Sequence, residues 1–329
     1  MLRTILTTAV LLLSACVVAA SDPGGRLSIH TMAVKLNPES ADVWTVGALT
    51  YRGGLALSAR HMNFGGLSGL LISADGSRMF AVSDRGHWFS ASLRYNHDGA
   101  PIELLAPALT PIRGINGSPL SGWLHRDAES LALNDTTLYV SFEHDHRILE
   151  FAVDGFPDAV TLGAVTPNVT APPDLSTLGE NTGLEALTLM PDGTLIAISE
   201  GDEHEVPTPG IAWQRTLGGD WRQLDYIRDS NFRPTGAATL DTGDVLVLER
   251  RFTVIGGVAA RLRLLKHVAK GNLEGKVIAE LIPPVSVDNM EGIAIRRDPS
   301  GKYLVYLLSD DNFLPVQRTL LLIFELTLD

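Results

Sequence analysis

Two sets of mostly acidic side chains recur along the chain, and the members of the first set lie 61, 56, 50 and 56 residues apart. The first set opens an apolar run in each repeat and consists of Ser68, Glu129, Glu185, Thr235 and Glu291. The second set follows the next apolar run and consists of Asp84, Glu143, Glu200, Glu249 and Asp310. Carboxylates that gather closely repel one another unless cations compensate them. If the fold brings the two sets together, they predict a cation site.

Calcium is the cation that this set predicts, because it is a hard ion that takes six to eight oxygen ligands. The spacing of His and Cys residues does not indicate zinc. The run His144-Asp145-His146 could chelate a metal ion, but a polar loop is the favoured interpretation. The expected calcium ligands are Glu129, Glu185, Glu291, Glu200 and Asp310. Alternatively, these glutamates bond to backbone amides of the neighbouring repeat and hold the repeats together.

Basic residues follow the second set directly. Arg85 and His87 follow Asp84, His144 follows Glu143, and Arg250 follows Glu249. Arginines can fork onto anionic oxygens, so Arg85, Arg250 and His144 are expected to bind an anionic ester group. His87 and Asp84 are the expected catalytic residues, with His87 as general acid or base. A single Asp-Arg pair can also be a structural salt bridge.

Each pair of recurring positions brackets a β-hairpin. The first copy has a strand at 67–73, a turn on Asp75-Gly76 and a strand at 79–83, and its outline recurs four times. Repeats of roughly this length are typical of the four-stranded blades of a β-propeller. The start of the first strand lies beside the end of the second in an antiparallel hairpin, which places both acidic sets at one mouth of the channel.

The sequence therefore predicts an all-β fold with a single β-propeller. Five repeats and the additional N-terminal material favour six blades, with five as the alternative. We expect the strand at 27–36 or the one at 43–50 to join the last blade, which contains the C-terminal run 320–328, because pairing of the chain ends in one blade closes the ring and removes free sheet edges.

The N-terminus has the pattern of an export signal. Arg3, the apolar run 5–13 and the following small residues predict a signal peptide over residues 1–20, with the propeller domain at 21–329. The run 13–16 resembles a lipobox, which would give Cys16 a lipid anchor; ordinary cleavage after Ala20 is the alternative. We expect an exported protein, periplasmic or lipid-anchored in the bacterial envelope, with no transmembrane span in the mature chain.

The composition limits the partners. The 329 residues are 45% hydrophobic and 19% charged, with a formal net charge of −12 at pH 7. An acidic chain repels nucleic acid and anionic membrane surfaces, so neither is expected as a partner. Cys16 is the single cysteine, so the folded part has no disulfide. We expect a monomer.

Two blocks carry a resemblance to a known family. GGLSGL…DG…AVSDRGHW and NMEGIAI…LLSDDNF resemble the bacterial phytase-like family described as having esterase-like activity of phytase, over roughly residues 45–326. The most specific matches are Asp84-Arg85-Gly86 and Glu291-Gly292 with Asp310-Asp311-Asn312. The resemblance implies a secreted β-propeller that hydrolyses phosphate or other esters, with a divalent cation as a possible cofactor.

These observations favour a secreted hydrolase of phosphate or carboxylate esters, with calcium at the channel mouth and a small anionic ester as substrate. One alternative is a non-catalytic binding scaffold of the envelope, in which the carboxylates only join the repeats. Another is a lactonase-like propeller, which also places a metal ion and glutamates in its channel.

Overall fold

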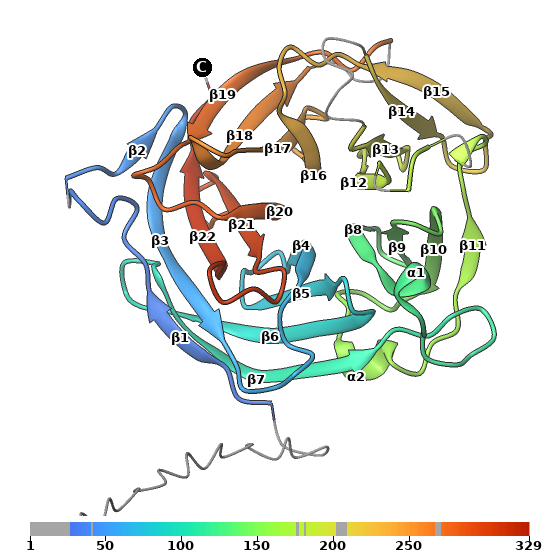
Figure 1. Ribbon diagram of the computed structural model, residues 1–329, viewed down its shortest axis with the longest axis horizontal. Coiled ribbons are helices and arrows are strands. Elements are labelled where there is room, and N and C mark those ends of the chain that lie inside the picture. Colours follow the sequence, from blue (N-terminus) through green and yellow to red (C-terminus); the bar gives the residue numbers. More distant parts are fainter. Residues whose placement is uncertain are drawn as a thin grey trace, which may run out of the picture.

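Five antiparallel sheets surround a central axis in the computed structural model (Figure 1). The structure describes residues 27–40, 42–175, 178–180, 182–201, 209–266 and 271–328, so the predicted signal peptide and Cys16 lie outside it. Four sheets have four strands each and the fifth has six. The protein is a single all-β propeller with five blades, and the prediction of six blades is wrong.

The blades follow one another along the chain. Blade 1 contains β4 (Leu67–Ile72), β5 (Arg78–Ser83), β6 (His87–Tyr95) and β7 (Pro101–Pro111). Blade 2 contains β8 (Ala128–Leu133), β9 (Thr137–Phe142), β10 (Arg147–Ala152) and β11 (Asn168–Thr170). Blade 3 contains β12 (Leu184–Leu189), β13 (Leu195–Ser199), β14 (Gly210–Arg215) and β15 (Trp221–Tyr226). Blade 4 contains β16 (Arg233–Thr239), β17 (Val245–Thr253), β18 (Gly257–Leu265) and β19 (Gly275–Leu281).

Blade 5 combines the two ends of the described chain. It contains β20 (Asn289–Arg297), β21 (Tyr303–Asp310), β22 (Thr319–Leu326), β3 (Leu49–Ser58), β1 (His30–Ala33) and β2 (Thr45–Val46). The connections add the short helices α1 (Trp123–Arg126) and α2 (Ala159–Leu162). In the described part of the chain, no helix is long and apolar enough to cross a membrane.

The predicted closure between N- and C-terminal strands is confirmed, but the N-terminal partner is β3. This strand pairs antiparallel with β22 and places Tyr51 opposite Phe324. Strands β1 and β2 pair with β3, not with β22. The N-terminal material that suggested a sixth blade is thus the outer part of blade 5, which explains why the blade count was overestimated.

Apolar side chains fill the space between neighbouring blades. The buried hydrophobic residues form five clusters, and each cluster draws its members from two adjacent blades. Between blades 1 and 2, for example, the rings of Trp88 and Phe151 lie 4.9 Å apart in an edge-to-face arrangement. The clusters hold the five inner strands, β4, β8, β12, β16 and β20, around the channel (Figure 1).

Every inner strand has a break in its ladder near its first residues. In four of them an acidic or hydroxyl residue of the first set is left without a partner in the register, namely Glu129 (together with Ser130), Glu185, Thr235 or Glu291. A bulge turns a side chain away from the regular alternation and is common beside functional sites. The bulges therefore reorient side chains at the same end of all five blades.

Phe324 tests the closure of the ring. Its ring is fully buried, with its centroid 5.4 Å from that of Tyr51 across the β3–β22 pair. Phe324→Ala should lower the free energy of unfolding by about 3–5 kcal/mol, because it leaves a cavity in this seam. Phe252→Ala is the matched control, since Phe252 is 65% exposed and its loss should change stability by less than about 0.5 kcal/mol. Chemical denaturation of both variants measures the difference; equal effects would contradict the assigned closure.

Candidate functional site at the channel mouth

A cavity of about 680 Å³ opens at the end of the propeller where the inner strands begin and the second strands end. Eight of its fourteen lining residues are carboxylates, and three others are Arg233, Arg250 and His144. The lining consists of Ser68, Asp84, Asp127, Glu129, Glu143, His144, Thr182, Glu185, Glu200, Arg233, Arg250, Glu291, Asp310 and Asn312. The structure thus brings the two recurring acidic sets together at one mouth.

Two members of these sets do not reach the cavity. Glu249 is fully buried within blade 4, where it accepts a hydrogen bond of 2.8 Å from the Tyr226 hydroxyl and pairs with Arg261. Thr235 donates its hydroxyl hydrogen to the backbone carbonyl of Met290 at 2.8 Å. Glu249 thus links blade 4 to blade 3 and Thr235 links blade 4 to blade 5, but neither makes the bond from a glutamate to a backbone amide that was kept as the alternative.

Asp127 lines the cavity although the sequence analysis did not select it. It precedes Glu129 by two residues and stands just before β8, outside the recurring positions. The charged run His125-Arg126-Asp127 directly before a repeat strand was the available signal. Burial raises the pKa of Asp127, while hydrogen bonding to Glu129 and the charge of His144 oppose this shift.

One side of the cavity is made of closely spaced carboxylates from blades 2 and 3. Glu129, Glu143 and Glu185 each offer an oxygen, and these oxygens lie within 4.8 Å of one another. Glu185 is only 5% exposed, and within the described residues its carboxylate has no hydrogen bond or ion pair. Burial, reinforced by neighbouring carboxylates, raises the pKa of Glu129 and of Glu185 well above the usual range. Burial and the charges of Asp127 and Glu200 raise the pKa of Glu143 to about 8.

The other side carries the arginines. Arg250 Nη2 lies 3.3 Å from Glu200 Oε1 and 3.7 Å from Glu291 Oε1, and Arg233 Nη1 lies 3.2 Å from Glu200 Oε2. Burial by itself lowers the pKa of Arg250, but the charges of Glu291, Glu200 and other carboxylates outweigh it and raise the pKa. This side therefore holds two fixed positive charges that the carboxylate side lacks.

Glu291, Asp310 and Asp84 form the wall contributed by blades 5 and 1. Glu291 accepts hydrogen bonds from Ser68 Oγ at 2.9 Å and from Asn289 Nδ2 at 2.6 Å. Burial, with the charge of Glu291 and other carboxylates, raises the pKa of Asp310 well above its usual range. Burial and the charges of Asp127 and Glu291 raise the pKa of Asp84 to about 7. Asp84 thus titrates near neutral pH.

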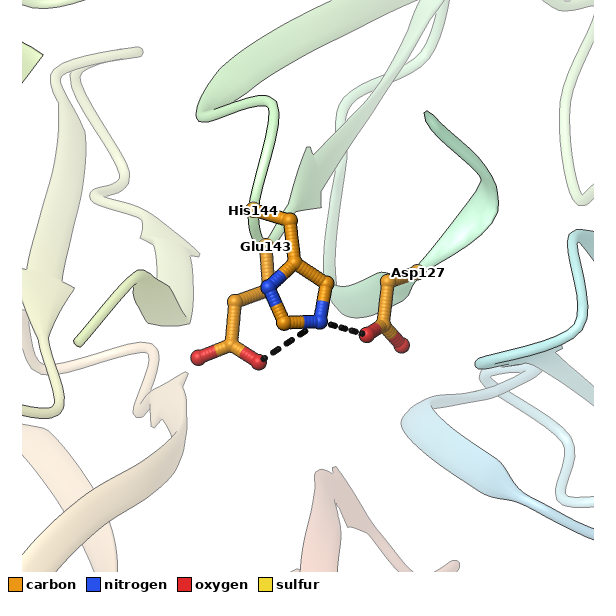
Figure 2. A group of neighbouring side chains, drawn as sticks. All are labelled: Asp127, Glu143 and His144. Atoms are coloured by element: carbon orange, nitrogen blue, oxygen red, sulfur yellow. Dashed lines mark ion pairs between the residues drawn. The ribbon is translucent and has the colours of Figure 1, made fainter. Parts of the chain in front are cut away.

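His144 lies between two carboxylates at the edge of the cavity (Figure 2). Its Nε2 is 3.1 Å from Asp127 Oδ2 and 3.9 Å from Glu143 Oε2. Its Nδ1 is 3.1 Å from the backbone oxygen of Glu180. The sequence analysis proposed His144 for substrate binding, and the structure places it beside acidic groups instead of the arginines.

His87 and Arg85 lie outside the lining of the cavity. His87, at the start of β6, has its Nδ1 2.9 Å from the Arg85 oxygen and its Nε2 3.3 Å from Asn63 Nδ2, and burial lowers its pKa. Arg85 donates to the Met62 carbonyl at 2.8 Å and stacks 3.3 Å from the centroid of the Phe313 ring. The catalytic role of His87 and the substrate-binding role of Arg85 stay predictions.

The arrangement has defined chemical capabilities. Buried carboxylates without nearby cations fit a hard divalent ion, which would supply the missing positive charge. Arginines on the opposite wall suit the oxygens of an anionic group. Asp84, with a pKa near 7, can exchange a proton at neutral pH.

Two solved structures with TM-scores above 0.5 share the fold of this chain. An α-L-arabinofuranosidase from Podospora anserina aligns over 86% of this chain and 98% of its own, with 12% identity and a TM-score of 0.53. A GH62 α-L-arabinofuranosidase catalytic domain from Coprinopsis cinerea aligns over 85% and 97%, with the same identity and TM-score. A glutaminyl cyclase from Myxococcus xanthus aligns over 81% and 94%, with 12% identity and a TM-score of 0.44.

Sequence comparison identifies the family. No curated protein sequence matches the chain. Residues 62–313 match the phytase-like family described as "Esterase-like activity of phytase", a span that runs from the loop before β4 to the loop after β21 and so includes every residue that lines the cavity. The chain belongs to this phytase-like family.

Proposed function

We propose that the protein hydrolyses small anionic esters of phosphoric or carboxylic acids in the channel-mouth cavity, with help from a divalent cation. The observation that carries this proposal is the division of one cavity into a cluster of carboxylates and a wall with two arginines. Membership of the family described as "Esterase-like activity of phytase" is consistent with ester chemistry. The substrate within this class is left open.

Calcium fits the carboxylate side best. Glu129, Glu143 and Glu185 provide only oxygen ligands, and the buried carboxylate of Glu185 has no partner among the described residues. A hard cation that tolerates irregular oxygen coordination suits such a set. When bound, calcium would polarise the ester oxygen and lower the pKa of a bound water. The proposed set keeps Glu129 and Glu185 from the sequence prediction and adds Glu143.

Glu200, Glu291 and Asp310, also expected as metal ligands, have other contacts in the structure. Glu200 and Glu291 pair with Arg250, and Asp310 accepts a 2.7 Å hydrogen bond from the backbone N–H of Asn312. We propose that these residues orient the arginine wall and do not bind the calcium directly.

The arginine side would hold the negative group of the substrate. Arg250 and Arg233 line the cavity, and their guanidinium groups can fork onto phosphate or carboxylate oxygens. Asp84 lies on the same cavity and titrates near pH 7, so we propose it as the group that takes a proton from the attacking water or returns one to the leaving group.

Two other functions lead to different results. A lactonase-like propeller would open neutral lactones with the same cation and would not need Arg250. A binding scaffold would turn over none of these esters, and its carboxylates would affect only stability. Assays of the purified full chain on a phosphomonoester, an aryl carboxylate ester and a lactone, with calcium and with chelator, separate the three. Calcium-dependent release of phosphate or carboxylate is expected.

Glu185→Gln tests the cation site. Removal of this charge should weaken calcium binding at least about tenfold, because the cluster loses one of its few ligands. Even changes to residues that only support a metal ligand reduce metal affinity by about this factor. Glu291→Gln is the matched comparison and should leave the calcium affinity within about threefold, since Glu291 bonds to Ser68 and Asn289 on the other wall. Calorimetric titration of both variants provides the affinities. Unchanged calcium binding by Glu185→Gln would refute the proposed ligand set.

Arg250→Lys tests the anion side while keeping the positive charge that balances Glu200 and Glu291. Loss of the forked donor should lower kcat/KM for anionic esters by about ten- to a hundredfold, as expected for one hydrogen bond to a charged group. A neutral ester should be affected much less. Arg297→Lys is the control, because Arg297 lies at the opposite end of the channel, paired with Asp241. Equal losses for anionic and neutral esters would rule out recognition of the anion by Arg250.

The raised pKa values predict how stability depends on pH without calcium. A carboxyl whose pKa is raised in the folded protein keeps a proton that the unfolded chain releases above about pH 4.3. Stability therefore falls as the pH rises from there to about 8, the pKa of Glu143. Calorimetry in chelator should show Tm decreasing between pH 5 and 8, and calcium should restore it at pH 8. A constant or rising Tm in chelator would contradict the raised pKa values.

A further inference from the structure

Both ring nitrogens of His144 face oxygen atoms. Nδ1 is 3.1 Å from the backbone oxygen of Glu180, and Nε2 is 3.1 Å from Asp127 Oδ2. A backbone carbonyl can only accept a hydrogen bond, so Nδ1 must carry the hydrogen. In the neutral ring, Nε2 then presents a lone pair toward a carboxylate oxygen. A proton or a metal ion must lie between these two atoms.

His87 shows the contrast. It also directs Nδ1 at a backbone oxygen, that of Arg85, but its Nε2 faces the amide nitrogen of Asn63, which can donate a hydrogen. The neutral imidazole of His87 is therefore satisfied as it stands. The neutral imidazole of His144 is not, because Asp127 offers no hydrogen when it is ionised.

The surroundings of His144 match those of a metal-binding histidine. Such a residue usually donates its second ring N–H to a backbone carbonyl or carboxylate, which fixes the ring and leaves the other nitrogen free to coordinate. The Glu180 carbonyl has this position here. Glu143 completes the group, since one ligand atom each from Asp127, Glu143 and His144 lie within 4.8 Å of one another (Figure 2).

The ring is also held in place from two other directions. The Trp123 ring, from α1, packs edge-on against it with the centroids 4.9 Å apart. The backbone of His144 has a φ of 58°, a left-handed conformation that non-glycine residues rarely adopt and that is often found at functional sites. Preorganisation of this kind is what a metal ligand requires and a solvent-exposed loop histidine does not.

We infer that Asp127, Glu143 and His144 form a second cation site, with a nitrogen ligand, that shares Glu143 with the calcium site. An imidazole together with carboxylates favours a borderline divalent transition ion such as Zn²⁺, Mn²⁺ or Co²⁺ over calcium. The sequence analysis found no zinc spacing because these ligands come from the loop before β8 and the turn after β9, and only the fold brings them together.

The inference rests on the proposed function for the neighbouring calcium site, but it concerns binding and not turnover. The rival explanation is that a second proton lies between His144 and Asp127, either on the imidazole as an ion pair or on a neutral Asp127 carboxyl. A titration with Co²⁺ separates the two explanations. A metal site binds the ion and gives a visible absorption spectrum that depends on its ligands, whereas a proton-bridged pair binds no Co²⁺.

The experiment titrates full-chain protein, stripped of metal and then saturated with calcium, with Co²⁺. One Co²⁺ per chain should bind, with a visible spectrum and calorimetric heat. His144→Gln should weaken this binding at least about tenfold. His125→Gln is the matched control, because His125 also pairs with an aspartate, Asp145, but is exposed and outside the cavity lining. It should bind Co²⁺ like the unaltered protein.

Two further variants keep the outcome decisive. Asp127→Asn should also weaken Co²⁺ binding and provides a second test if His144→Gln does not fold. Glu185→Gln should weaken calcium but not Co²⁺, which separates failure of the second site from failure of the proposed calcium site. The inference is overturned if the calcium-loaded protein binds no Co²⁺, or if a folded His144→Gln or Asp127→Asn variant binds Co²⁺ as tightly as the unaltered protein.

Discussion

The repulsion among eight carboxylates in one cavity, five of them buried and three half-buried, is the constraint on which the structure of the site depends. Removing a charged group from water is costly, and like charges that share a small volume increase the cost. Two arginines offset this on one wall, but among the described residues neither Glu129 nor Glu185 forms an ion pair with a cation. The raised pKa values of these groups express the same imbalance. A site of this kind is stable when its carboxylates are protonated or when they bind cations. Its function depends on which of these two states is populated at neutral pH.

The propeller can hold such a site because its stability comes from elsewhere. Five apolar clusters lie between the blades, and the β3–β22 pair joins the two ends of the described chain in one sheet. The inner strands are fixed from both sides by these clusters, so the bulges at their ends can direct polar side chains at the channel without support from the polar groups themselves. The fold thus tolerates the unfavourable charges that the chemistry needs.

Much of this could be predicted from the sequence. The hairpin repeats indicated the propeller and placed both acidic sets at one mouth, because strand pairing alone determines which ends meet. The blade count could not be read in this way, since β3 contributes to blade 5 from the far end of the chain. Asp127 was not selected from the sequence, and Glu249 was expected at the mouth but lies inside blade 4. A recurring position in the sequence predicts at which end of its blade a residue lies. The direction of its side chain depends on neighbours from other strands, such as Tyr226 and Arg261 for Glu249.

Divergence among the repeats explains why the cavity has two different sides. Blades 2 and 3 keep an acidic residue at both recurring positions, and they supply the cluster of Glu129, Glu143 and Glu185. Blade 4 has Thr235 at the first position and turns Glu249 into its interior, and the same blade presents Arg233 and Arg250 to the cavity. Blade 4 therefore presents positive charge to the cavity next to a cluster that lacks it. A symmetric ring of glutamates could only collect cations, whereas this asymmetric ring can hold a cation and an anion side by side, as hydrolysis of a charged ester requires.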